Sequence, residues 1–376
     1  MKKILSAVFA VLFTVSASFA VEWGGVFNDN TKGSTQKFES ASLEQSNAIY
    51  FWLKNPVGEN MSFSAEALYK YVLSVDNGRS SFLNIIDSDL LKFAGDFTSG
   101  KGKISFAAGR FPFADLSSTI FSQVSDGVSF KYDLPLVRLS AYAGYTGLLN
   151  AFSVSMVDSR TVGTPVSQVY TLCHGYVPVM ANVVFPVIFN NQSLGFGFNI
   201  FTDVEPTKSN KYYGSLVLSG PLANSVFYNL TTSFGSENFK NCMNYSSFQL
   251  YIFPVQSIMI IVGAEYASGN NGFLSPYHAV TYFQASKALG SPELSGVIIP
   301  QLTVSATFGD AWIGGTAKYV LDATESVKNG GLELDCSFAY NIFTDLKVGC
   351  DITAYMDFSN SNSSLFTASL NAALAF

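Results

Sequence analysis

Histidine and cysteine, the residues that most often do chemistry or hold metals, are few in this chain. The two histidines, His174 and His278, lie in segments predicted to be loops, and no His-Glu-x-x-His motif frames them. The sequence also lacks a Cys-x-x-Cys pair, a phosphate-binding P-loop and a GxGxxG turn. We therefore predict that the protein is not an enzyme and that it holds no cofactor and no metal.

The four cysteines could form two disulfide bonds or none. Cys173 and Cys242 fall in predicted outer loops, where an oxidising environment permits a disulfide. Cys336 and Cys350 fall on consecutive predicted strands, roughly equidistant from the turn between them, so they could face each other. Either pair could equally be small apolar thiols, and both alternatives stay open.

Charged residues recur at alternate positions of apolar segments. Between Leu346 and Phe358 one parity is apolar throughout, whereas the other carries Lys347, Asp351 and Asp357. A period of two residues is typical of a β-strand with one apolar face and one polar face. Because a Lys or Arg facing the middle of a bilayer costs about 2–4 kcal/mol, we expect the charged face to line water.

When the other segments are assigned an apolar face and a polar face in the same way, their polar faces predict a set of charged side chains along the wall of a pore. The set is Glu66, Lys70, Asp87, Asp89, Lys131, Arg138, Glu265, Lys318, Glu333, Asp335, Lys347, Asp351 and Asp357. Acids outnumber bases in it, and because rings of charge set the selectivity of pores, this favours a mild preference for cations. The alternative is that these groups only keep the lumen wet and pair with one another.

Segments of about ten residues with this alternation follow one another almost without interruption from Val21 to Phe376. Tight turns such as 190–192 alternate with longer polar loops such as 204–211, as expected for the two ends of a transmembrane barrel. The count predicts an all-β, antiparallel barrel of about 18 strands, within a range of about 16 to 20. Counting Ala151–Val157 and Ala279–Ala285 as strands would give about 20, but would place long loops on the periplasmic side. The polar stretch 29–37 is predicted to be a loop.

The composition excludes an ordinary soluble domain. Hydrophobic residues make up 48% of the chain and charged residues only 13%, against about 25% charged residues in typical soluble proteins. Beyond residue 20 no apolar run reaches the roughly 18 residues of a membrane-spanning helix. Since only helices and closed barrels satisfy every backbone hydrogen bond in lipid, the sequence predicts a transmembrane β-barrel. A large soluble β-sandwich or β-helix is the alternative.

The first twenty residues have the form of a secretory signal peptide. A basic start at Lys2 and Lys3 precedes an apolar run, and the small residues Ser18 and Ala20 stand where a signal peptidase would cleave before Val21. We therefore predict a signal peptide over residues 1–20 and one barrel domain with outer loops over residues 21–376. The formal net charge of −6 argues against a nucleic-acid partner, because phosphate backbones require basic surfaces.

The final segment, SLFTASLNAALAF, alternates apolar and small or polar residues and ends on Phe376. It resembles the assembly signal of bacterial outer-membrane β-barrel proteins. This resemblance implies an outer-membrane location, contact with outer-membrane lipid, and insertion by the barrel assembly machinery. It also implies the function of a porin, passive diffusion of small hydrophilic solutes or ions. A transporter of hydrophobic compounds of the fatty-acid type, or a structural or adhesive surface barrel, remains the alternative. Homotrimers are common among porins, but the sequence shows no interface.

The connection 112–125 is the third outer loop in this count. Its position is similar to that of the third loop of general porins, which folds into the barrel and narrows it. The resemblance implies that Asp115 is an acid at the pore constriction. Arg110, just before this connection, falls in phase with the apolar Phe106 rather than with the charged face. An ordinary surface loop is the alternative.

Overall fold

The computed structural model describes residues 21–36, 40–152, 154, 169–206, 209–268, 296–323, 328–358 and 364–376. The predicted signal peptide, His278 and the segment Ala279–Ala285 lie outside these residues. Among the described residues, no helix is long and apolar enough to cross a membrane.

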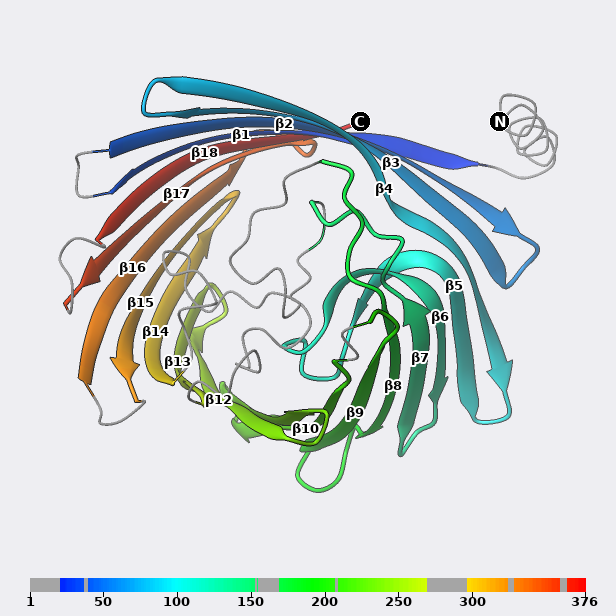
Figure 1. The fold of residues 1–376 in the computed structure, drawn as a ribbon. Helices are drawn as coiled ribbons and strands as arrows, with labels where there is room; N and C mark the ends of the chain where they lie inside the picture. Colours follow the sequence, from blue (N-terminus) through cyan, green and yellow to red (C-terminus); the bar gives the residue numbers. More distant parts are fainter. Residues whose placement is uncertain are drawn as a thin grey trace, which may run out of the picture.

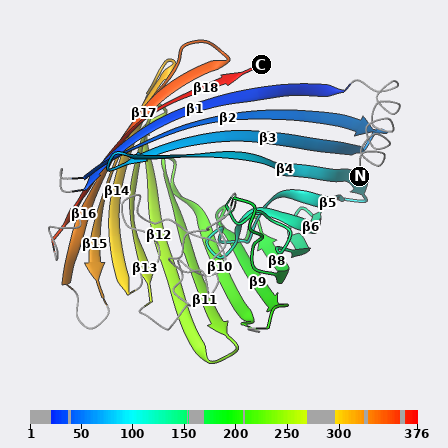
Figure 2. The ribbon, with the colours of Figure 1, turned by 45° about the horizontal axis from the view of Figure 1, so that its top comes forward.

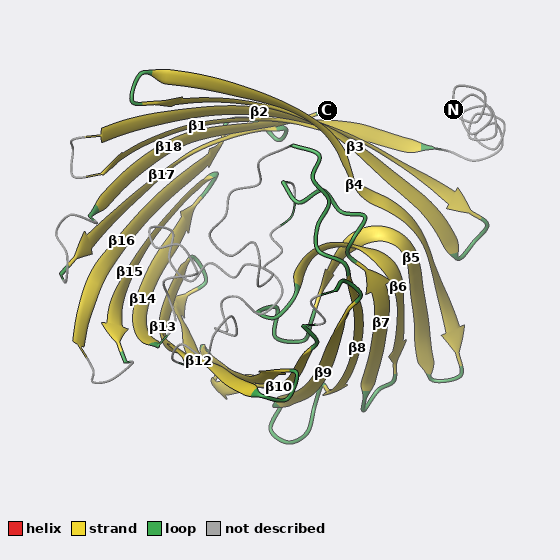
Figure 3. Ribbon diagram, viewed as in Figure 1, coloured by secondary structure: helices red, strands yellow, loops and turns green. Residues whose placement is uncertain are grey.

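The described chain forms one closed barrel of eighteen antiparallel strands (Figures 1 and 3). Each strand pairs with its neighbours in sequence, and β1 also pairs with β18, so the sheet has no first or last strand. The strands are β1 (Glu22–Gln36), β2 (Ser40–Val57), β3 (Met61–Asp76), β4 (Arg79–Ser99), β5 (Gly102–Ala114), β6 (Ser122–Asp133), β7 (Arg138–Tyr145), β8 (Tyr176–Phe185), β9 (Ser193–Asp203), β10 (Lys211–Ala223), β11 (Val226–Glu237), β12 (Asn241–Val255), β13 (Ile258–Ala267), β14 (Val297–Phe308), β15 (Ala311–Asp322), β16 (Lys328–Asn341), β17 (Leu346–Asp357) and β18 (Leu365–Ala375). The predicted fold class and strand number are confirmed.

The two faces of the wall differ as the alternation predicts. On β17, the outward side chains of Ile352 and Met356 are about two-fifths exposed, whereas Thr353 and Tyr355, between them in sequence, are buried. Directly opposite residues on paired strands share a face, so the strand registers extend this assignment around the barrel. The outward face is mainly apolar, and the polar and charged side chains gather inward.

Most connections at one end of the barrel are short turns and most at the other end are longer, although β3 and β4 are joined at the second end by residues 77–78 alone. We call these the turn end, where β2 meets β3 and β6 meets β7, and the loop end, where β5 meets β6 and β7 meets β8. Strands β1 to β4 are long, and in the view of Figure 2 they run together as one extended wall.

The prediction of a loop over residues 29–37 is wrong for most of that stretch. Strand β1 continues to Gln36 and pairs throughout with β2 and, from Val26 onward, with β18. The reason is that the strand ladder uses backbone groups, and neighbours on both sides hold this segment extended although its side chains are polar.

The barrel wall forks between β4 and β5. Strand β4 pairs with β3 up to the Asp76–Arg79 turn pair, but with β5 only from Leu91 to Ser99. Within the described chain, residues 79–90 of β4 therefore have a strand on one side only. The ends of β5 and β6 turn away from them into the barrel (Figures 1 and 2).

Candidate functional site inside the barrel

The connection between β5 and β6, residues 115–121, lies inside the barrel, and we call it the inner loop. Its Ile120 and Phe121 are fully buried, and the Phe121 ring lies 5.8 Å from that of Phe201 on the inner face of β9. They belong to a buried cluster that also includes inward residues of β7, β8, β10 and β12. Burial of this apolar surface holds the loop against the wall, so the predicted inward fold of the third loop is confirmed.

Two glycines on β9 make the seat for this loop. A Cβ atom placed on Gly197 would lie 3.0 Å from the Cβ of Leu116, and one on Gly195 would lie 3.1 Å from a methyl carbon of the same side chain. Because glycine has no side chain, the Leu116 side chain packs directly against the wall there. The position of the inner loop therefore depends on the two glycines of β9 as much as on the residues of the loop itself.

Asp115 has a different role from the one expected. Its carboxylate is 3% exposed and accepts hydrogen bonds from the backbone amides of Ser117, Ile120 and Phe121, and from the Ser117 hydroxyl. Burial raises the pKa of the Asp115 carboxyl above its usual range, against the opposing effect of these hydrogen bonds. Asp115 thus shapes the inner loop from within, because its oxygens are directed to the loop's own backbone and not to water.

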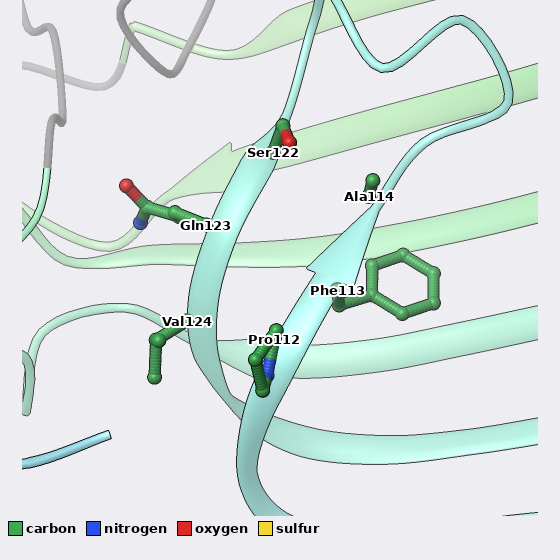
Figure 4. A pocket seen from close by; sticks show the side chains of 6 residues that line it. All are labelled: Pro112, Phe113, Ala114, Ser122, Gln123 and Val124. Carbon is green, nitrogen blue, oxygen red and sulfur yellow. The ribbon is translucent and has the colours of Figure 1, made fainter. Parts of the chain in front are cut away.

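An open pocket follows the hairpin that carries the inner loop (Figure 4). It is lined by Pro112, Phe113, Ala114, Ser122, Gln123 and Val124. The Phe113 ring stacks on Tyr142, with centroids 4.0 Å apart. Both polar atoms of the Gln123 amide are buried and have no hydrogen-bond partner among the described residues.

Arg110 joins the separated strands at the fork. Its guanidinium makes two parallel hydrogen bonds of 2.8 Å to the Asp126 carboxylate on β6. It also donates to the carbonyl oxygens of Ser88 on β4 (3.3 Å) and Leu148 in the β7–β8 connection (3.1 Å), and lies 3.9 Å from the Asp87 carboxylate. One side chain therefore connects β4, the inner-loop hairpin and a second outer connection.

The sequence contained a sign of this arrangement. Arg110 is out of phase with the charged face, and it directly follows Gly109, whose φ is +117°. A Cβ on Gly109 would lie 2.0 Å from the Leu91 carbonyl oxygen, so only glycine allows the bend. In the sequence, the fork therefore corresponds to an arginine that breaks the alternation directly after a glycine. The alternation by itself predicted no role for this arginine.

The thirteen predicted pore residues on strands fall into three groups by exposure. Glu265, Glu333 and Asp335 are buried. Glu66, Lys70, Asp87, Asp89, Lys318, Asp351 and Asp357 are partly exposed, and Lys131, Arg138 and Lys347 are exposed. The register places Glu66 opposite Leu90, and Asp87 opposite the inward Leu68, so the acids of β3 and β4 gather beside the fork.

Several of these charges are paired within the wall. Lys318 Nζ lies 3.3 Å from a Glu333 oxygen, and the Asp335 carboxylate accepts from the Thr353 hydroxyl at 2.6 Å. Asp351 accepts from Ser337 and Asn371 at 2.5 and 3.1 Å. Arg138, near the turn end, faces Asp133 at 3.6 Å with both side chains largely exposed. The exposed charges Lys131, Arg138 and Lys347 lie near the turn end, whereas Asp87, beside the fork, is largely covered and lies against Arg110.

His174 belongs to a buried network between two connections at the loop end. Its Nε2 lies 2.8 Å from the Asp203 carboxylate, and its Nδ1 lies 3.4 Å from Glu205. Asp203 also accepts from the backbone amides of Glu205 and Ser209. The network ties the β7–β8 connection to the β9–β10 connection. Within the described ranges, no group of three or more His, Cys, Asp or Glu side chains is arranged so that it could hold a metal ion.

The cysteines on β16 and β17 do not face each other directly. Cys336 is opposite Ile352, and Cys350 is opposite Phe338, so the two thiols are offset by two residues on the same outward face and are not joined by a disulfide. The other two differ in surroundings, since Cys173 is buried and Cys242 is exposed.

No family model and no curated protein matches this sequence. Solved structures do match it. OccK7 (OpdD) of Pseudomonas aeruginosa has a TM-score of 0.65 at 11% identity, over 95% of this chain and 98% of that chain. OpdL of the same organism has a TM-score of 0.62 at 11% identity, over 95% and 98%. OccAB4 of Acinetobacter baumannii has a TM-score of 0.60 at 10% identity, over 95% and 98%. At identities this low, the comparison shows the fold alone: the chain has the β-barrel fold of these Occ and Opd proteins over nearly its whole length.

Proposed function

We propose that the protein is an outer-membrane porin, a water-filled channel for passive diffusion of small hydrophilic solutes or ions with a mild preference for cations. The observation that carries this proposal is the inner loop, which lies inside a closed barrel whose polar and charged side chains gather inward and whose outward face is mainly apolar. Such a barrel satisfies its backbone hydrogen bonds in lipid, and a loop folded into it narrows the passage without a separate plug.

The orientation and targeting follow from the same features. In outer-membrane barrels the short turns face the periplasm, so we place the turn end there and the loop end outside. Residues 1–20 serve as the signal peptide. Phe376, which is 62% exposed at the end of β18, serves as the contact for the barrel assembly machinery. The proposal is for a channel rather than an enzyme.

The preference for cations rests on the acids beside the fork. Glu66, Asp87 and Asp89 lie on the two strands next to the inner-loop hairpin, and the guanidinium of Arg110 is engaged by Asp126 through two hydrogen bonds. Acids still outnumber bases around the fork when Lys70 and Lys92 of the same two strands are counted, so the net charge near the narrowed passage is negative, which favours cations. A carrier of hydrophobic compounds fits less well, because its path would cross these charges.

Conductance in a planar bilayer tests the proposal. Purified, folded protein should produce discrete channel steps, and a salt gradient should give a reversal potential of the sign expected for modest cation preference. Folded barrels that insert but do not conduct would overturn the porin assignment. Anion selectivity would overturn only the role given to the acids.

A further inference from the structure

Four polar side chains form a compact patch on the outward face of the barrel. We call Asp29, Thr31, Gln45 and Asn47 the polar seam. Asp29 lies opposite Asn47, and Thr31 opposite Gln45, so the four occupy adjacent positions on β1 and β2. The Gln45 amide donates to the Asp29 carboxylate at 2.6 Å, and the Thr31 hydroxyl donates to the Gln45 amide oxygen.

The seam faces away from the lumen. Its β2 residues share a parity with Leu43 and Ile49, which are 47% and 44% exposed, and Thr31 lies opposite Leu370, which is 65% exposed. Along the strands it is bounded by Phe27 and Ile49 toward the turn end and by Leu43 toward the loop end. The seam is therefore an island of polarity within the apolar outer band.

The neighbouring strands show how unusual this island is. The outward positions of β17 and β18 hold apolar residues only: Leu346, Val348, Cys350, Ile352, Ala354, Met356, Phe366, Ala368, Leu370, Ala372 and Leu374. An ionisable group that faces hydrocarbon is costly, and in membrane proteins such groups are normally directed to protein or water. Lipid alone is an unfavourable neighbour for Asp29.

A second outward polar group, on β11 and β12, contains no charged residue and differs from the seam in its hydrogen bonding. Thr232, Asn244 and Ser246 are uncharged and hydrogen-bond among themselves at 2.8 to 3.2 Å. The seam, in contrast, contains a carboxylate, and the Asn47 amide has no hydrogen-bond partner within the part of the chain that the structure describes. The β11–β12 side chains therefore satisfy one another's hydrogen bonds, whereas the seam still has hydrogen-bond donors and acceptors to offer.

We propose that the seam is an interface with a second copy of this chain. Asn47 carries amide donors, and Asp29 of another copy offers the matching acceptor. Two copies that stand in the membrane with the same orientation, related by an axis along its normal, can form this pair reciprocally. β18, β1 and β2 lie side by side in an extended wall (Figure 1), which gives the copies a continuous surface to share. The interface requires that the barrel spans a membrane, and it is independent of conduction.

The test compares oligomeric mass in mild detergent by size-exclusion chromatography with light scattering. Wild-type protein should have the mass of two copies. The double variant Asp29→Leu/Asn47→Leu should have the mass of one, with unchanged conductance per barrel, because leucine suits lipid but removes the pairing. Ser246→Leu, which alters the internally satisfied group, should remain oligomeric. A wild-type protein of single-copy mass, or an oligomeric double variant, overturns the proposal.

A photo-crosslinking amino acid at position 47 provides the second measurement in intact membranes, where detergent cannot separate the copies. Irradiation should give an adduct of twice the chain mass, and the same label at the exposed, outward Val304 should give several-fold less. No adduct, an adduct of another mass, or equal yields at the two positions would each count against the interface. Conductance recorded from the same preparation separates failure of the interface from failure of the channel assignment.

Discussion

At the scale of single residues, the charged groups with the most specific geometry hold structure in place and do not meet solutes. Asp115 satisfies several backbone amides of the inner loop, and Arg110 connects β6, β4 and a third segment. Both rely on charge-assisted hydrogen bonds in surroundings with little water, where such bonds are strong. Substitutions at these positions should therefore act on the shape of the pore.

Replacing Asp115 by alanine should loosen the inner loop. The amides of Ile120 and Phe121 would lose their acceptor, at a cost of roughly 1–3 kcal/mol for each buried group left unpaired. We expect larger and noisier single-channel currents from Asp115→Ala, and a smaller change from Asp115→Asn, which keeps one acceptor oxygen. Currents identical to the wild type in both variants would show that this carboxylate does not shape the passage.

Replacing Arg110 by alanine should destabilise the fork. The bidentate pair with Asp126 is mostly shielded from solvent, with side-chain exposures of 20% and 23%, and its loss should cost on the order of 1.5–3 kcal/mol. Arg138→Ala is the matched control, because its exposed pair with Asp133 should contribute at most about 1 kcal/mol. Thermal unfolding in detergent measures both, and equal effects would argue against a special role for Arg110.

At the scale of elements, the pore depends on how the inner loop fits β9. Gly197→Leu would place a side chain where Leu116 now lies, and should push the loop from the wall into the remaining opening, so conductance should fall. Gly214→Leu is the control, since a Cβ there meets no atom within 4 Å. A lowered conductance in both variants, or in neither, would contradict the proposed seat.

The elements also show what alternation could and could not predict. Each strand's phase is a local property, so counting segments predicted the strand number, and the parity of β17 predicted its faces. The continuation of β1 past Asn28 was missed because its polar side chains mimic a loop, whereas pairing with β2 and β18 decides its conformation. The new role of Asp115 depends on how the inner loop folds back on its own backbone and becomes buried inside the barrel, which no local pattern reports.

At the scale of the whole molecule, closure joins the first and last strands. The backbone amide of Gly25 donates to the Phe376 carbonyl at 2.8 Å, and the Phe376 amide donates to the Gly25 carbonyl at 2.9 Å. A Cβ on Gly25 would lie 2.5 Å from the Phe376 ring, so the ring covers this glycine. The terminal residue thus takes part in the last bonds that close the sheet.

Deleting Phe376 should impair assembly more than conduction. The amount of heat-modifiable, folded protein in the outer membrane should fall, while the barrels that do form should conduct as the wild type does. Leu374→Ala, at a similarly outward position of β18, should leave assembly nearly unchanged. Normal assembly without Phe376 would remove the role proposed for it with the assembly machinery.

The fork gives the barrel an uneven stiffness around its circumference. A closed ladder of strands acts as a hoop, because widening it requires hydrogen bonds to lengthen everywhere at once. Near the turn end the hoop is complete, but at the level of residues 79–90 of β4 it is cut, and the contacts across the cut among the described residues include those of Arg110 and the hydrogen bond from the Ile86 amide to the Tyr170 hydroxyl. The rim at the loop end is therefore less stiff at the fork than elsewhere around the barrel. We expect it to bend most easily at this one place, while the rest of the wall keeps its radius.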